Sequence, residues 1–219
     1  MKKLAHRRVA GIVLVATALA PVTMLASPAS AFPKGDPVYK FKYKVVATSY
    51  IKRADLTLTT APGIFKGGID LANGKLLGSI SLPNVTFTQS EAGVGLVTAT
   101  SSIQQTKPVT GHVNIGTFKV TSTSTFNIRL ISMYPAIPTL PLPLPLPLPI
   151  PQVNLVGNGC MTSSPIKVTM SGIANLGEAS TFKGTFTIPD FVNCGVMTAV
   201  INQEIPGPGN TFSATASPA

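Results

Sequence analysis

Residues 118–132 read FKVTSTSTFNIRLIS, and this stretch decides the fold class. Its even positions carry the apolar side chains, namely Phe118, Val120, Phe126, Ile128 and Leu130. Its odd positions from Lys119 to Arg129 carry polar ones, and Ser122 and Ser124 keep the two sets in phase. An alternation with period two places one set on each face of a β-strand. The stretch therefore predicts one unusually long strand, or two strands joined by a β-bulge.

Shorter stretches of the same kind, each bounded by Gly, Pro or Asn, recur along the chain. They predict strands at residues 56–59, 75–82, 96–100, 166–170, 182–188 and 211–216. Apolar spacings of three and four residues, which would indicate helices, are scarce beyond the N-terminus. We therefore expect an all-β fold, an antiparallel sandwich or barrel-like domain.

Residues 39–45 interleave aromatic or apolar side chains with three lysines, Lys40, Lys42 and Lys44. A strand here has three ammonium groups on one face and three rings on the other. One interpretation is an edge strand whose lysines deter pairing with other chains. The other is a basic stripe that binds an acidic surface.

Two segments of the chain echo each other. Residues 77–85 (LGSISLPNV) share with residues 183–191 (KGTFTIPDF) a pattern of Gly, hydroxyl, apolar, hydroxyl, apolar, Pro, and Asn or Asp. The echo places Ile80 and Leu82, like Phe186 and Ile188, on an inward face. We expect two related β-units, about residues 50–134 and 152–219, folded together in one domain. Chance similarity among Ser/Thr-rich strands is the alternative.

The N-terminus has the order of a secretion signal. Four basic residues precede an apolar run over residues 9–26, and Ala29-Ser30-Ala31 offers a small-residue cleavage site. We expect residues 1–31 to be removed and residues 32–219 to form one exported β-domain, secreted or associated with the cell envelope. The alternative is an uncleaved membrane anchor. No second apolar run predicts a membrane span after cleavage.

Without the signal, the chain keeps thirteen basic and seven acidic side chains. This modest excess favours an anionic envelope polymer or lipid as a partner, or merely aids solubility. A dense Arg patch and Trp are both missing from the sequence, so nucleic-acid binding is not expected.

The two cysteines, Cys160 and Cys194, are bound for an oxidising compartment, and we expect them to form a disulfide. A structural zinc site needs four Cys or His ligands, and the exported part of the chain has two Cys and His112. We therefore expect no metal and no cofactor.

The most unusual segment is 135–151, in which Leu and Pro alternate without interruption from Leu140 to Pro149. Proline lacks an amide donor and fixes φ, so a polyproline II loop is expected. Its exposed leucines are candidate binding residues for a lipid, a wall component or a partner, and they are Leu142, Leu144, Leu146 and Leu148. The alternative is a stiff spacer.

The sequence offers little for catalysis. A hydrolase needs a nucleophile, a base and an orienting group, and His112 in Gly111-His112-Val113 is the single candidate base of the exported part. We interpret this segment as a turn leading into a strand and His112 as structural. Gly207-Pro208-Gly209-Asn210 is interpreted as the turn before the last strand. We expect no catalytic residues.

Three motifs near the C-terminus carry a resemblance. They are residues 159–165 (GCMTSSP), 184–195 (GTFTIPDFVNCG) and 207–211 (GPGNT). With them the last 60 residues or so resemble a group of actinobacterial secreted proteins of unknown function, and the long alternating strand does so more loosely. The resemblance implies a Cys160–Cys194 pair and an exported β-domain, and it implies no activity. The Leu-Pro run departs from this group.

These observations lead to three hypotheses. The first is a non-enzymatic secreted or envelope-associated protein with a structural or binding role. The second is an extracellular carrier of lipid or another apolar molecule, held in a cavity between the β-units. The third, a secreted hydrolase that uses His112, has the least support in the sequence.

Overall fold

The structure is a computed structural model, and it describes residues 38–91, 95–135, 153–175 and 177–219. The described chain contains twelve strands, a short 3-10 helix η1 (Gly195–Met197) and the helix α1 (Thr198–Glu204). The strands are β1 (Val38–Ile51), β2 (Leu56–Thr59), β3 (Gly63–Asp70), β4 (Lys75–Ser81), β5 (Val85–Glu91), β6 (Gly95–Val113), β7 (Lys119–Pro135), β8 (Met161–Thr162), β9 (Ile166–Ile173), β10 (Ser180–Ile188), β11 (Phe191–Val192) and β12 (Gly207–Pro218). The expected all-β fold is confirmed.

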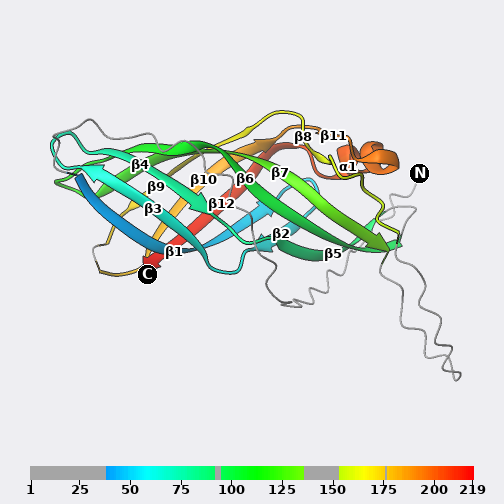
Figure 1. Cartoon of the computed structure of the whole chain (residues 1–219), viewed down its shortest axis with the longest axis horizontal. Helices are drawn as coiled ribbons and strands as arrows, with labels where there is room; N and C mark the ends of the chain where they lie inside the picture. Colours follow the sequence, from blue (N-terminus) through cyan, green and yellow to red (C-terminus); the bar gives the residue numbers. More distant parts are fainter. Residues whose placement is uncertain (1–37, 92–94, 136–152, 176) are drawn as a thin grey trace, which may run out of the picture.

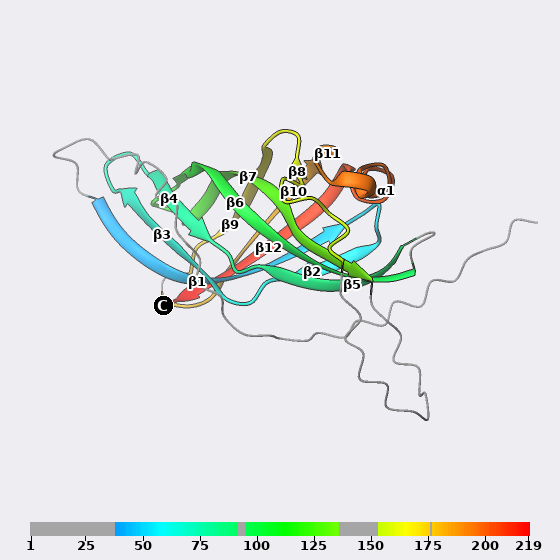
Figure 2. The same cartoon turned by 45° about the vertical axis from the view of Figure 1, so that its right-hand side comes forward.

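Eight of the strands close into a ring. Their order is β7-β9-β10-β12-β1-β3-β4-β6, and β6 pairs with β7 to complete the circle, every pair being antiparallel. The molecule is therefore barrel-like (Figure 1). β8, β11 and α1 lie together at one end in both views (Figure 2). We call this end the cap end, and the opposite end, where β1 begins, the loop end.

The long alternating stretch forms one strand of 17 residues, β7. Its pairing with β6 shifts register at three places, between Thr100 and Ser101 and on both sides of Lys107. These β-bulges let the long strands bend so that the sheet can close into a ring. Phe126 and Leu130 are buried inside the barrel as the alternation predicts.

The remaining predicted strands are confirmed: residues 56–59 are β2, residues 75–81 are β4, and the others lie within longer strands. β1 pairs with β3 along Val38–Val45 but with β12 only along Tyr43–Tyr50, so residues 38–42 have a paired neighbour on one side and the edge-strand interpretation fits this part alone. The lysines stay on its outer face. Phe41 and Tyr43 pack inward, with ring centroids 5.5 Å apart for Phe41–Tyr43 and 5.8 Å for Phe41–Phe65, whereas Tyr39 is exposed.

Two further interpretations need correction. Residues 207–210 do not form a separate turn, because they already belong to β12, where Asn210 is buried and its amide donates to the Gly207 carbonyl at 2.8 Å. His112 lies at the end of β6 and not at a strand start, since the turn follows it at residues 114–118.

The echoing segments occupy β4 with its following loop, and β10 with β11. Ile80 and Leu82 line a small interior cavity, and Phe186 and Ile188 are buried. The two related halves remain a prediction. The signal at residues 1–31 and the Leu-Pro alternation from Leu140 to Pro149 lie outside the described residues.

Candidate functional site

The most distinctive internal feature is an apolar cavity of about 60 Å³ at the cap end. Fourteen of its seventeen lining residues are apolar, and they come from strands on all sides of the barrel. The lining residues are Ser49, Ile51, Ala54, Leu56, Leu58, Thr60, Val85, Phe87, Ser101, Ile103, Phe126, Ile128, Leu130, Phe186, Ile188, Phe191 and Ile205.

The cavity offers no charge to a ligand, since its three polar lining residues are Ser49, Thr60 and Ser101. The Thr60 hydroxyl already accepts the Ala47 amide at 3.1 Å. The space is partly open at the surface, and it exceeds what one water needs. Its apolar lining offers a water few polar partners. The site therefore suits an uncharged, mainly apolar group.

A second cavity of about 20 Å³ adjoins the first. Ile103 and Phe126 line both cavities. The small cavity lies just beyond the point where β4 stops pairing with β6. There the Gln105 side chain accepts the Ile80 amide at 2.8 Å in place of a backbone partner. The hollow region thus extends from the cap end towards the middle of the barrel.

One wall of the large cavity is a seam between β2 and β5. Within the described residues, β2 pairs only with β1, and β5 pairs only with β6. Leu56 and Leu58 of β2 line the cavity from one side of the seam, and Val85 and Phe87 of β5 line it from the other. The facing edges of the two strands therefore have no backbone ladder between them.

The sequence explains why this ladder is missing. β3 and β4 pair up to Ile64 opposite Ser81, and extending this register by two residues would put Pro62 opposite Pro83. Neither proline has an amide hydrogen to donate, so the ladder ends there. β2 and β5, which continue the two strands, are left as two edges.

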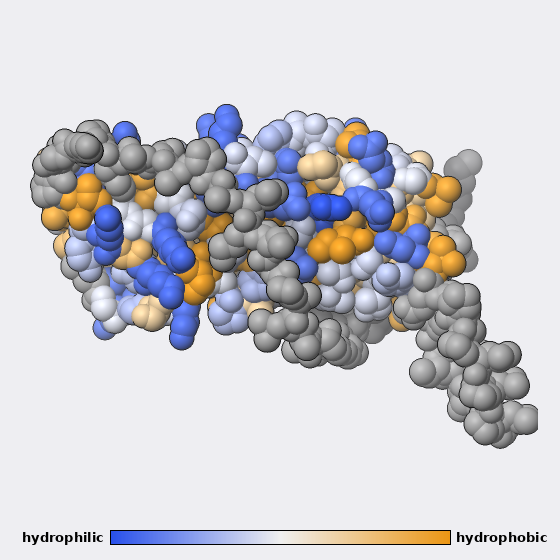
Figure 3. Space-filling view, viewed as in Figure 1, coloured by the Kyte–Doolittle hydropathy of each residue, from blue (hydrophilic) through white to orange (hydrophobic). Residues whose placement is uncertain are grey.

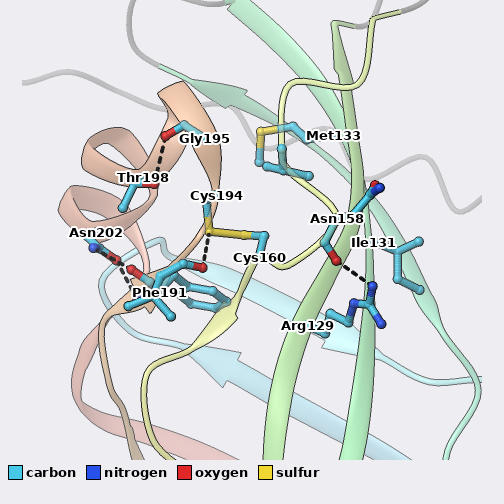
Figure 4. The surroundings of a disulfide bond; sticks show 12 residues. Arg129, Ile131, Met133, Asn158, Cys160, Phe191, Cys194, Gly195, Thr198 and Asn202 are labelled. Atoms are coloured by element: carbon cyan, nitrogen blue, oxygen red, sulfur yellow. Dashed lines mark hydrogen bonds between the residues drawn. A yellow bond between two sulfur atoms is a disulfide. The ribbon is translucent and has the colours of Figure 1, made fainter.

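The opposite wall of the cavity is fixed by the cap. The disulfide Cys160–Cys194 is fully buried, and it joins the segment before β8 to the segment after β11 (Figure 4). The Asn202 side chain of α1 accepts the Phe191 amide at 2.7 Å and donates to the Phe191 carbonyl at 3.0 Å. Phe191 is thereby held in the cavity wall by both of its backbone groups.

The β1–β2 turn closes the bottom of the site. The amide of Lys52 donates to Asn210 Oδ1 at 3.0 Å, which ties this turn to the start of β12. The Tyr50 hydroxyl donates to Asp55 Oδ1 at 2.9 Å. This hydrogen bond to the carboxylate raises the pKa of Tyr50, because the phenol is stabilised in its protonated form.

The predicted binding residues lie apart from this cavity. Lys40, Lys42 and Lys44 are exposed on the outer face of β1 towards the loop end. Leu142, Leu144, Leu146 and Leu148 lie outside the described residues. The predicted disulfide of Cys160 and Cys194 is confirmed, and it is consistent with a compartment outside the cytoplasm.

His112 is exposed on the outer face, with Lys75 of β4 and Thr121 of β7 as its cross-strand neighbours. No cluster of three or more His, Cys, Asp or Glu that could hold a metal occurs in the part of the chain that the structure describes. No described helix is long and apolar enough to cross a bilayer.

Sequence reasoning missed β5, Asn202 and the seam. The alternation of Val85, Phe87 and Gln89 with threonines and a serine is a usable signal for β5. The proline pair is visible in the sequence too, although its meaning depends on the register of β3 and β4.

No family model, no curated protein and no solved structure matches this chain.

Proposed function

We propose that this protein is an exported, non-enzymatic carrier that holds an uncharged, mainly apolar molecule in the cavity behind β2 and β5. The single observation that carries the proposal is the lining of that cavity, with fourteen apolar side chains and no charged one. In a small barrel the side chains normally fill such a space, since protein interiors leave few voids larger than a water.

The size of the cavity sets a condition on the ligand. An engineered cavity of about 150 Å³ accepts benzene, and the 60 Å³ found here is less than half of that. A ligand larger than a few carbon atoms must therefore widen the site. The hydroxyls of Ser49 and Ser101 can receive a weakly polar group at one end of such a ligand.

The seam is the place where widening costs least. Separating β2 from β5 breaks no backbone ladder between them, whereas separating any two ring strands breaks several hydrogen bonds. A molecule that enters through the seam meets Leu58 and Phe87 first and the barrel interior next.

Native mass spectrometry of gently purified protein tests the proposal. We expect a bound apolar molecule in the wild type and its loss in Ser101→Leu, in which the added carbon atoms occupy the cavity. Ser81→Leu, the same change at an exposed position outside the barrel, is the matched control and should keep the ligand. Repeated preparations of wild-type protein without any co-purifying molecule, and without uptake of added fatty alcohols, would refute the carrier.

The structural or envelope-binding role is the second candidate, and the exposed lysines of β1 favour it. It is compatible with the carrier because the lysines and the cavity occupy different parts of the barrel. The hydrolase stays the least supported prediction, and Ala in place of His112 would test it.

A further inference from the structure

The loop end of the barrel exposes five large apolar side chains. Tyr39, Leu71, Ile115, Phe118 and Ile173 each keep between 39% and 61% of their surface accessible. The other exposed large apolar side chains, Leu96, Ile131, Val153, Val192 and Val196, lie towards the cap end, so exposure alone does not single out the loop end. What distinguishes the loop end is that its apolar side chains lie on neighbouring turns beside lysines, a combination that marks an interaction site.

The five side chains are contiguous around this end. Tyr39 lies opposite Ile69, next to the β3–β4 turn that carries Leu71. The Val113 amide donates to Gly74 in that turn at 2.8 Å, and the β6–β7 turn with Ile115 follows. The Phe118 carbonyl then accepts the Ala174 amide at 2.9 Å, next to Ile173. Three neighbouring turns thus present one apolar arc.

The β6–β7 turn holds its apolar residues in a fixed conformation. Asn114 accepts three backbone amides in four hydrogen bonds. The amides of Gly116 and Thr117 donate to its side chain, and those of Thr117 and Phe118 donate to its carbonyl. Phe118 has φ of 54°, a left-handed conformation that is uncommon for a large side chain. Phe118 thus combines an unfavourable backbone conformation with an exposed ring, and this combination is typical of a functional position.

Lysines surround the arc. Lys40, Lys42 and Lys66 lie on the outer face of β1 and β3, and Lys75 and Lys119 begin β4 and β7. Figure 3 shows strongly hydrophilic side chains next to hydrophobic surface at this end. Lys42 stands directly opposite Lys66 in the ladder, an arrangement of like charges that weakens a sheet.

Carboxylates do little to neutralise these lysines. Asp70 is buried, and its oxygens accept the Ala72 amide at 2.9 Å and the Asn73 side chain at 2.5 Å. Glu178, in the β9–β10 loop, is the exposed carboxylate of this end among the described residues. No described carboxylate pairs with Lys42 or Lys66, so an anionic partner would lower the repulsion between them.

We propose that the loop end docks on an anionic phospholipid bilayer, with the apolar arc in the headgroup region and the lysines against the phosphates. The inference goes beyond the carrier function, because the arc and the cavity lie towards opposite ends of the barrel. A lipid surface fits better than a soluble polyanion because a polyanion offers no apolar region that could bury the five exposed apolar side chains. It fits better than a second copy because two lysine-rich ends would repel each other.

Co-sedimentation of the purified protein with vesicles tests the proposal. We expect binding to phosphatidylcholine vesicles that contain phosphatidylglycerol, and at least tenfold weaker binding to pure phosphatidylcholine. Each lysine near an anionic surface contributes about a fivefold gain in binding. Lys40→Gln, Lys42→Gln and Lys66→Gln together should therefore weaken binding about a hundredfold, and salt should weaken it as well.

The matched charge control changes Lys52, Lys107 and Lys167 to Gln. These exposed lysines lie in the β1–β2 turn, in the middle of β6 and near the cap-side start of β9, so the net charge falls equally while the loop end stays intact. We expect at most a few-fold loss in this variant. Equal losses in the two triple variants would mean that net charge alone drives binding and would overturn the proposal.

The apolar arc has its own pair of variants. Leu71→Ser, Ile115→Ser and Ile173→Ser together should weaken vesicle binding at least tenfold, whereas Val153→Ser with Val196→Ser, at the exposed cap end, should leave it unchanged. Thermal unfolding confirms that each variant is folded. Binding to polyphosphate that matches vesicle binding and ignores the arc variants would identify a soluble polyanion instead. A dimer in sedimentation velocity that the arc variant abolishes, without vesicle binding by the wild type, would identify a second copy.

Discussion

The two walls of the cavity are held in different ways. The cap wall is stabilised by a buried disulfide and by the Asn202 side chain, which hydrogen-bonds to both the amide and the carbonyl of Phe191. The seam wall consists of two edge strands with no described backbone ladder between them, and a proline lies next to each strand, Pro62 after β2 and Pro83 before β5. A site with one fixed wall and one movable wall can bind molecules that are larger than its resting volume. The predictions below test this difference.

Removing the disulfide should have the largest effect. Cys160→Ser with Cys194→Ser frees a loop of 34 residues in sequence separation, which costs about 4 kcal/mol in the chain-entropy model. Urea unfolding of the two proteins measures the change. Ligand retention should fall too, because the cap wall loses its cross-link. An unchanged unfolding midpoint would show that the cap does not depend on the bridge.

Truncating one side chain in each wall compares the walls directly. Ile188 is fully buried in the fixed wall, and Ile188→Ala should cost about 3 kcal/mol of unfolding free energy. Leu58 is only half-buried at the seam, and Leu58→Ala should cost about 1 kcal/mol. Equal costs in chemical denaturation would argue that the seam is packed as firmly as the cap.

Asn202→Ala should cost about 2 kcal/mol, because it leaves the buried amide and carbonyl of Phe191 without their partner. Thr198→Ala is the control on the same helix, since the Thr198 hydroxyl makes one exposed hydrogen bond to the Gly195 carbonyl. In thermal unfolding, the midpoint should fall more in Asn202→Ala than in Thr198→Ala. A control that destabilises as much as Asn202→Ala would contradict a specific role for Asn202.

Replacing Pro62 and Pro83 should change the free energy of unfolding least and the rate of hydrogen exchange most. Pro62→Thr with Pro83→Thr supplies two amide donors at the end of the β3–β4 ladder, so pairing can extend into β2 and β5. The net change in stability should stay within about 1 kcal/mol, since new hydrogen bonds offset the lost rigidity of proline. Hydrogen exchange should slow at residues 56–59 and 85–88, and ligand uptake should slow with it. Unchanged exchange at both strands would show that the prolines do not keep the seam open.

Much of the fold was predictable because it depends on local pattern. The alternation over residues 118–132 identifies β7, and the ring-bearing face of residues 39–45 identifies the inward side of β1. The edge interpretation of residues 39–45 fits only the part before Tyr43, because β12 pairs with β1 from Tyr43 onwards and exposed lysines also occur on the outer face of interior strands. The pairing of Cys160 with Cys194 was predictable because no other cysteine exists in the chain.

The sequence by itself determined eight of the twelve described strands, their inward faces and the cross-link, because period-two patterning and cysteine count can be read without tertiary contacts. Only the tertiary structure decided that β6 and β7 close a ring, that β2 and β5 are left without a ladder between them, and that three apolar turns and the lysines adjoin at the loop end. These features depend on register between residues far apart in the chain. Register follows from the sum of many weak pairings across the whole sheet, and no single segment encodes it.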